Sequence, residues 1–253
     1  DTGNPIPYSA MLLRDALEAA IQKVDPQQRD PALEHAVAIG HSQGGLLAKF
    51  TAIESEDKLW NVVSKKTLEE MDISQEQKEL FRRMLFIKPL PFVRRVVFIS
   101  TPHQGSFVAA TWVAQKIGKA VKVPGKAVRG MTDVMKKEED AIKINPEDQF
   151  GAVFGMTPGH PGLKALAELP IDDRVTAHSI IAVKGDGPPE EGNDGVVKYK
   201  SAHIDGVASE LVVRSGHSTQ SFPPTIEEVR RILLLHAEEW CGKEVVCQTQ
   251  GAQ

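Results

Sequence analysis

The chain has 253 residues, of which 41% are apolar, and this is enough for a sizeable core without disulfide or metal staples. Its net charge of −4 and the lack of a basic stripe argue against a nucleic-acid surface. No apolar run approaches the length of a membrane-spanning helix. We therefore expect a single domain over residues 1–253.

The N-terminal segment has no initiator Met, signal peptide or basic leader, and residues 1–5 have the character of a loop interior. We expect the numbering to start inside a longer precursor. Residues 8–24 place Leu13, Leu17 and Ile21 at helical spacing and predict an amphipathic helix. The compartment stays undetermined, with a secreted or periplasmic one favoured.

The first chemical motif is the G-x-S-x-G sequence of residues 40–44, which lies between the apolar run 36–39 and a helical pattern over residues 44–54. This context predicts a nucleophile elbow, a tight turn that needs small residues on both sides of the serine. The helix behind the turn directs unpaired N–H groups at the serine hydroxyl. Ser42 is therefore the candidate nucleophile, and the backbone N–H of Gln43 is the candidate oxyanion donor.

The next segment, residues 60–91, has a charged helical pattern in which Ser74 and Gln77 predict a capping box. Residues 96–99 predict a second buried strand. Residues 104–170 are too long for a simple crossover, and we interpret them as a largely helical cap or lid. An ordinary pair of surface helices is the alternative.

Apolar side chains of this cap are candidates for an acyl-binding site, although they could equally be plain core. The candidates are Phe107, Trp112, Phe150, Phe154 and Met156.

The third strand is expected over residues 175–183, followed by an acidic loop rich in glycine and proline. Asp194 in that loop is the candidate acid. Asp186, Glu190 and Glu191 are rivals in what reads as a solvated stretch. A calcium-binding loop is excluded because the ligand spacing and the central glycine are wrong.

The fourth strand is expected over residues 210–213, and His217 follows it. Ser42, Asp194 and His217 occur in the order nucleophile, acid, base that a Ser-Asp-His relay takes on a parallel sheet. His103 and His203 compete for the role of base, but His103 precedes the acid and His203 precedes the last strand. His41 should pack beneath the elbow, and His41 and His103 are also candidate substrate contacts.

The remaining histidines, His35, His160, His178 and His236, are expected to be structural or solvent-facing. Thr225 and Glu228 predict a capping box that starts a terminal helix. Cys241 and Cys247 could form a disulfide or stay free thiols, because spacing alone does not decide.

Strands that alternate with helices predict an α/β fold with a mostly parallel sheet and helices on both faces. An oxyanion hole needs a second donor, normally from a loop after an earlier strand. No such His-Gly segment precedes Ser42, and the upstream strands are missing as well. We expect further residues before Asp1, although an abbreviated domain with a donor elsewhere is the alternative.

Four segments together resemble the α/β-hydrolase superfamily on its lipase and esterase side. Residues 40–45 resemble the lipase elbow, and residues 100–106 resemble the Thr-Pro-His-x-Gly-Ser loop of bacterial triacylglycerol lipases and their glycolipid-deacylating relatives. Residues 193–197 and 215–218 resemble the acid and histidine loops. The absent His-Gly segment is the departure from the pattern.

The resemblance implies hydrolysis of a small-molecule or lipid ester through an acyl-enzyme, with no cofactor or metal and with transient contact to a lipid interface. An acyltransferase or thioesterase with the same three residues is one alternative. A non-catalytic binding domain that kept the fold is the other.

Overall fold

The computed structural model describes residues 4–108, 133–134, 137–143 and 156–241. Their strands form one four-stranded parallel sheet in the order β1-β2-β3-β4. The strands are β1 (Ala36–His41), β2 (Val93–Ile99), β3 (Thr176–Ala182) and β4 (Ser209–Val213). The α-helices are α1 (Ile6–Val24), α2 (Gln43–Lys49), α3 (Lys58–Val63), α4 (Gln75–Leu85), α8 (Pro161–Glu168), α9 (Tyr199–Ala202) and α10 (Pro223–Cys241).

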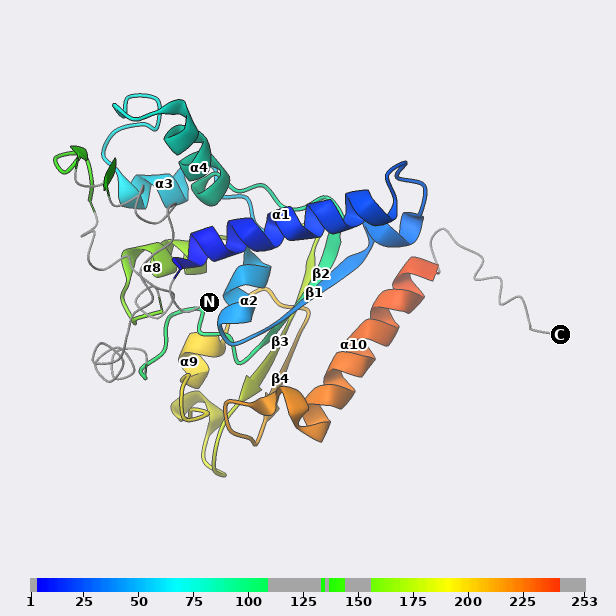
Figure 1. The fold of residues 1–253 in the computed structure, drawn as a ribbon. Helices are drawn as coiled ribbons and strands as arrows, with labels where there is room; N and C mark the ends of the chain where they lie inside the picture. The colour runs from blue at the N-terminus through cyan, green and yellow to red at the C-terminus, as the bar shows by residue number, and fades with distance from the viewer. Residues whose placement is uncertain (1–3, 109–132, 135–136, 144–155, 242–253) are drawn as a thin grey trace.

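The sheet is covered on both faces, as the alternating pattern predicts (Figure 1). Val96 and Phe98 of β2 belong to a core cluster that Leu17 of α1 joins. Their neighbours Val97 and Ile99 point the other way, into a cluster with Ile232 of α10. This two-sided burial explains why the strands read as nearly continuous apolar runs.

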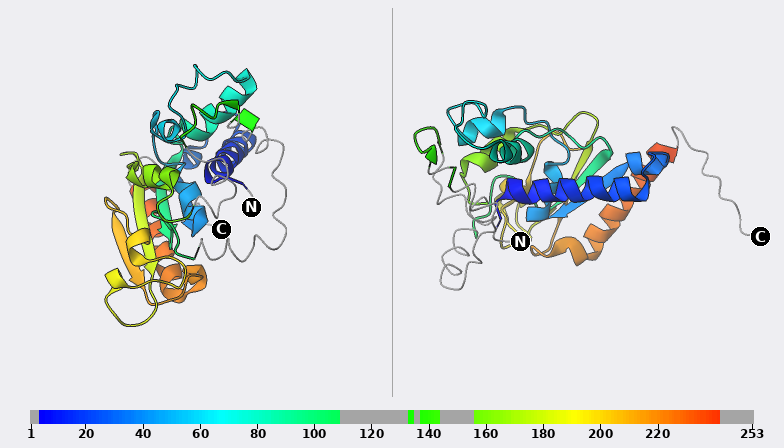
Figure 2. Two further views of the ribbon diagram at one scale, coloured as in Figure 1. Left: turned by 90° about the vertical axis from the view of Figure 1, so that its left-hand side faces the viewer. Right: turned by 45° about the horizontal axis from the view of Figure 1, so that its top comes forward.

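Helices α3, α4 and α8 gather at the end of the molecule away from the C-terminal end of α10 (Figures 1 and 2). They share the largest core cluster with α1 and α2. The predicted capping box of α4 is confirmed, because the Ser74 side chain and the Gln77 side chain each accept a bond from the other's backbone N–H.

Two details of the predicted helices are wrong. The helix expected over residues 44–54 ends at Lys49, and the chain turns there with the Thr51 hydroxyl donating to the carbonyl of Ala48. Helix α10 begins at Pro223 without the expected capping box. The Thr225 hydroxyl bonds instead to that of Thr219, and Glu228 pairs with Arg231.

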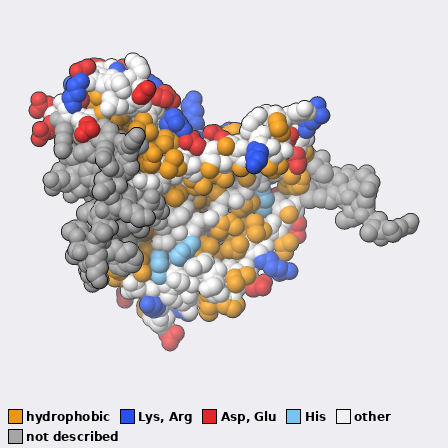
Figure 3. Space-filling model, in the orientation of Figure 1, with side chains coloured by type: hydrophobic (Ala, Val, Ile, Leu, Met, Phe, Trp, Pro, Cys, Tyr) orange, Lys and Arg blue, Asp and Glu red, His pale blue; other side chains and the backbone are white. Residues whose placement is uncertain are grey.

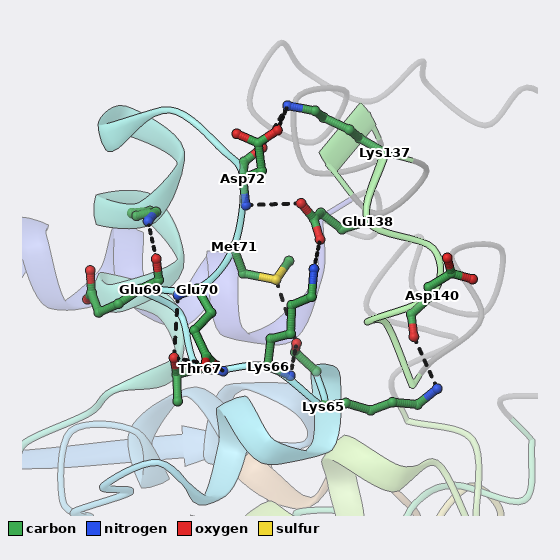
Figure 4. A network of polar contacts seen from close by, with 12 residues as sticks. Lys65, Lys66, Thr67, Glu69, Glu70, Met71, Asp72, Lys137, Glu138 and Asp140 are labelled. Carbon is green, nitrogen blue, oxygen red and sulfur yellow. Dashed lines mark hydrogen bonds and ion pairs between the residues drawn. The ribbon is translucent and has the colours of Figure 1, made fainter.

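Most of the segment interpreted as a cap, residues 104–170, lies outside the described residues. The described piece 137–143 docks on the connection between α3 and α4 (Figure 4). The Glu138 carboxylate, 7% exposed, accepts from the Lys66 ammonium at 2.8 Å and from the backbone N–H of Asp72 at 3.0 Å. Lys66, followed by that N–H, lowers the pKa of Glu138. Glu138 is therefore one anchor of this piece, beside the backbone bridge between Ser64 and Ile142.

An apolar surface lies over β1 between α1 and α10 (Figure 3). The exposed large apolar side chains of these three elements are Leu12 and Val24 of α1, Ile39 of β1, and Ile226, Leu233 and Leu234 of α10. Within the described residues, β1 pairs with β2 on one side and with no strand on the other. Among the same residues, no helix combines the length and apolar character that a membrane crossing needs.

Candidate active site

The nucleophile elbow follows β1 as the motif predicts. Ser42 has φ of 54° and ψ of −127°, a region that side-chain-bearing residues rarely occupy. A Cβ on Gly40 would lie 2.3 Å from the carbonyl oxygen of Gly44, and a Cβ on Gly45 would lie 1.8 Å from the Thr101 hydroxyl. Gly44 itself has open space around it. The need for a small residue therefore falls on Gly40 and Gly45, which corrects the expectation for Gly44.

The structure brings together the three side chains that the sequence singled out. His217 Nε2 lies 2.9 Å from Ser42 Oγ, and His217 Nδ1 lies 2.7 Å from Asp194 Oδ2. A carboxylate only accepts, so Nδ1 carries the hydrogen and Nε2 is free to accept the serine proton. The His217 side chain is 17% exposed, whereas that of Asp194 is 1% exposed. A ligand can therefore approach the imidazole but not the acid.

The acid loop holds Asp194 in place with backbone donors. Its Oδ1 accepts from the N–H groups of Val196 and Val197 at 2.8 and 2.7 Å. Its carbonyl accepts from the backbone N–H of His217 at 3.1 Å. Buried charge is tolerated here because both carboxylate oxygens have partners. Asp186, Glu190 and Glu191, the rival acids, have no such contact with His217.

Gln43 is the first residue of α2, so its N–H belongs to the turn whose donors have no partner inside the helix. That is the position an oxyanion donor requires.

His41 contacts His217 directly. Its Nε2 lies 2.7 Å from the His217 carbonyl oxygen, and the two ring centroids are 4.9 Å apart. Burial, opposed by that hydrogen bond, lowers the pKa of His41, and the charge of His217 lowers it further. The predicted substrate contact of His41 remains a prediction.

His103 is buried, and its ring packs edge-to-face on Phe98 at 4.8 Å between centroids. Burial lowers its pKa to about 3, and the Lys49 charge adds to the effect. Neither ring nitrogen has a hydrogen-bond partner among the described residues. The histidine that contacts the Ser42 hydroxyl is His217, so His103 does not take that position. Its contact with a substrate remains a prediction.

The candidate acyl-site residues are only partly described. Phe107 is 39% exposed, with the Lys198 ammonium 5.9 Å from its ring centroid. Met156 is half-buried against the large core cluster, and its carbonyl accepts from Ser106 N–H. Trp112, Phe150 and Phe154 lie outside the described residues, as does the side chain of Cys241 with Cys247.

Two basic side chains with at most 1% exposure were not singled out from the sequence. Lys49, two turns after Ser42, is fully buried and donates to the carbonyl of Ala167 at 3.2 Å. Arg95 is 1% exposed on β2 and contacts His178, His236 and Glu239. Arg94 and Arg95 interrupt the apolar run 93–99, and Arg95 falls on the same face as the buried Val97, which is the signal that could have found the second one.

A parallel sheet with helices on both faces, an elbow serine after β1 and a histidine after β4 define the α/β-hydrolase fold. No protein-family model matches the chain, and no curated protein matches it by sequence.

Solved structures similar to this chain include a lipase of Bacillus licheniformis, BlEst2. Its propeptide form has 14% sequence identity and a TM-score of 0.49, over 90% of this chain and 41% of that one. Its mature form has 14% identity and a TM-score of 0.48, over 93% of this chain and 76% of that one. A lipase of Staphylococcus hyicus has 13% identity and a TM-score of 0.44, over 83% and 71%. The chain thus spans less than half the length of the propeptide form.

Proposed function

We propose that the chain is a serine hydrolase that cleaves carboxylic esters through an acyl-enzyme. The observation that carries the proposal is the continuous hydrogen-bonded relay from Asp194 through His217 to the Ser42 hydroxyl, at 2.7 and 2.9 Å. A serine hydroxyl is a weak nucleophile unless a base takes its proton, and a base needs a fixed tautomer. The relay supplies both.

In the first half of the reaction, Ser42 Oγ attacks the ester carbonyl carbon while its proton passes to His217 Nε2. Asp194 stabilises the imidazolium, and the N–H of Gln43 donates to the developing oxyanion. When the intermediate collapses, the bond to the alcohol oxygen breaks and the alcohol leaves with the proton from Nε2. A water molecule then repeats the attack on the acyl-enzyme and releases the acid.

The substrate that we propose carries an apolar acyl group, in a small molecule or a lipid. Phe107 is exposed one residue after Ser106, whose hydroxyl donates to the Val196 carbonyl in the acid loop at 2.7 Å. An exposed aromatic ring next to a residue that bonds to the acid loop supports an apolar acyl-binding surface there. The cap over residues 104–170 is proposed to complete that surface.

The test is the hydrolysis of p-nitrophenyl esters from acetate to dodecanoate by the wild type, Ser42→Ala and His217→Ala. We expect activity in the wild type only, rising with chain length. Ser209→Ala is the matched control, because Ser209 also bonds to a histidine but lies at the other end of the sheet. Turnover that survives Ser42→Ala would refute the proposal.

Acyl transfer and thioester cleavage by the same relay are separated by adding an alcohol or by using a thioester of the same acid. A transferase yields the new ester in preference to the free acid.

A further inference from the structure

Two neighbouring residues of the elbow both bond to His217. Ser42 Oγ lies 2.9 Å from the imidazole Nε2, and His41 Nε2 lies 2.7 Å from the backbone carbonyl of the same histidine. Along a regular strand, successive side chains point to opposite faces. The positive φ of Ser42 breaks that alternation, and the elbow therefore contacts His217 at its ring and at its backbone.

The bond to the His217 carbonyl shows which ring nitrogen of His41 carries a hydrogen. A carbonyl oxygen only accepts, so Nε2 of His41 carries the hydrogen. The two rings lie 4.9 Å apart at 46°. Burial lowers the pKa of His41, which favours the neutral ring. A neutral ring adds no repulsion when His217 becomes an imidazolium during the reaction.

Among the described residues, the hydrogen bonds that hold His217, apart from those to Ser42 and His41, come from Asp194. Its backbone N–H donates to the Asp194 carbonyl at 3.1 Å, and its Nδ1 donates to the Asp194 carboxylate at 2.7 Å. Both contacts tie His217 to the acid loop, and neither fixes its distance from Ser42. The bond from His41 ties the histidine loop to the strand that carries the nucleophile.

We propose that His41 is a positioning residue, which holds the His217 backbone so that Nε2 stays within reach of the Ser42 hydroxyl. The inference rests on the proposed function for its catalytic consequence. Displacing a catalytic base by about 1 Å costs on the order of 100-fold in rate. The contact itself can be tested without turnover.

The test compares His41→Leu, which removes the donor, with His41→Gln, whose side-chain amide can donate at a similar reach. We expect kcat on a p-nitrophenyl ester to fall about 10- to 100-fold in His41→Leu, with KM within about 2-fold. The His41→Gln variant should recover most of the lost kcat. The pH profile of kcat/KM should shift in His41→Leu and return in His41→Gln, because it reports the free enzyme's base.

A second readout keeps the contact separate from the activity. The His217 Nδ1–H shared with Asp194 should give a low-field proton resonance in the wild type. We expect that resonance to broaden or vanish in His41→Leu and to persist in His41→Gln. If the wild type hydrolyses no ester and the resonance still responds in this way, the proposed function fails and the positioning role stands.

The positioning role is overturned if a folded His41→Leu keeps both the wild-type kcat and the resonance. It is also overturned if His41→Gln loses as much kcat as His41→Leu, because the donor would then not matter. Should His41→Leu fail to fold, His41→Asn takes its place in the comparison with His41→Gln. The asparagine amide is one methylene shorter, so its donor does not reach the His217 carbonyl as that of glutamine does.

Discussion

The two ends of the sheet each hold a histidine bonded to a serine, and only one of these pairs can activate the hydroxyl. At the carboxyl end, His217 lies between Asp194 and Ser42. At the opposite end, His178 lies between Arg95 and Ser209, with Nδ1 2.7 Å from the Ser209 hydroxyl.

The two pairs differ because the third partner of the histidine is a donor in one and an acceptor in the other. Arg95 can only donate, so His178 Nε2 accepts and Nδ1 must donate to Ser209. The Ser209 hydroxyl in turn points to Glu228 at 3.4 Å. In the other pair the carboxylate of Asp194 accepts, and His217 can take the proton of Ser42. A serine beside a histidine is therefore no evidence of a nucleophile until the third partner is known.

The largest effect is expected where the third partner of His217 is changed from an acceptor to a group that can donate. Asp194→Asn presents an amide that can donate to Nδ1, which places the hydrogen on Nε2 and blocks proton transfer from Ser42. We expect kcat to fall about 10⁴-fold. The carbonyl of the asparagine can still accept from Val196 and Val197, so the melting temperature should stay close to the wild-type value. A variant with more than a tenth of the wild-type kcat would contradict the tautomer argument.

At the opposite end of the sheet, we expect the protonation of His178 to change the stability of the fold and not the rate of ester hydrolysis. Burial and then the Arg95 and Arg231 charges lower the pKa of His178 to about 4, against the weaker opposing effect of Glu228 and Glu239. A histidine whose folded pKa is lowered binds protons better when unfolded. The free energy of unfolding should therefore fall between pH 6.5 and pH 4, by about 1–3 kcal/mol from this residue.

Urea unfolding of the wild type and of His178→Gln at neutral pH and at pH 4.5 measures this contribution. The wild type should lose more stability on acidification than the variant does. Equal losses would show that His178 is not the group responsible.

Lys49 and Arg95 differ in whether a carboxylate compensates the charge of the buried side chain. Arg95 is paired with Glu239 at 2.6 Å, whereas Lys49 has a carbonyl partner, and burial lowers its pKa to about 8. Below pH 8 the folded chain bears the full cost of that buried charge, and the cost is relieved as pH rises toward the usual lysine value. We expect Lys49→Met to raise the free energy of unfolding at pH 7 by about 1–3 kcal/mol, and by less at pH 10. A loss of stability would mean that the bond to Ala167 outweighs the desolvation.

The smallest effect is expected for Ser209→Ala. Its hydroxyl takes no part in the relay, so kcat should stay within about 2-fold of the wild type. Loss of its hydrogen bonds should cost about 1 kcal/mol of stability. Chemical unfolding and ester hydrolysis measured on the same sample check both statements, and a large loss of kcat would break the contrast between the two ends.

The sequence predicted the parts of this comparison that depend on strand order. Parallel strands place the loops after β1, β3 and β4 at one sheet edge, which is why Ser42, Asp194 and His217 could be named in advance. It did not predict which side chains fill the opposite end. Arg95, His178 and Glu239 are far apart in the chain, and their contact depends on the packing of α10.

Local patterns failed where tertiary contacts supplied another partner. Thr225 fits a capping box, yet it bonds to Thr219 because the preceding turn lies against it. The resemblance included Gly45 in the elbow, and the structure adds the physical reason: the Thr101 side chain, just after β2, leaves no room there for a Cβ.

The most direct test of the central claim is the reaction of the folded protein with a fluorophosphonate probe, followed by intact mass. The account predicts a single adduct on the wild type and on Ser209→Ala, none on Ser42→Ala, and much slower labelling of His217→Ala. A folded wild type that forms no adduct, or an adduct that persists in Ser42→Ala, would contradict it.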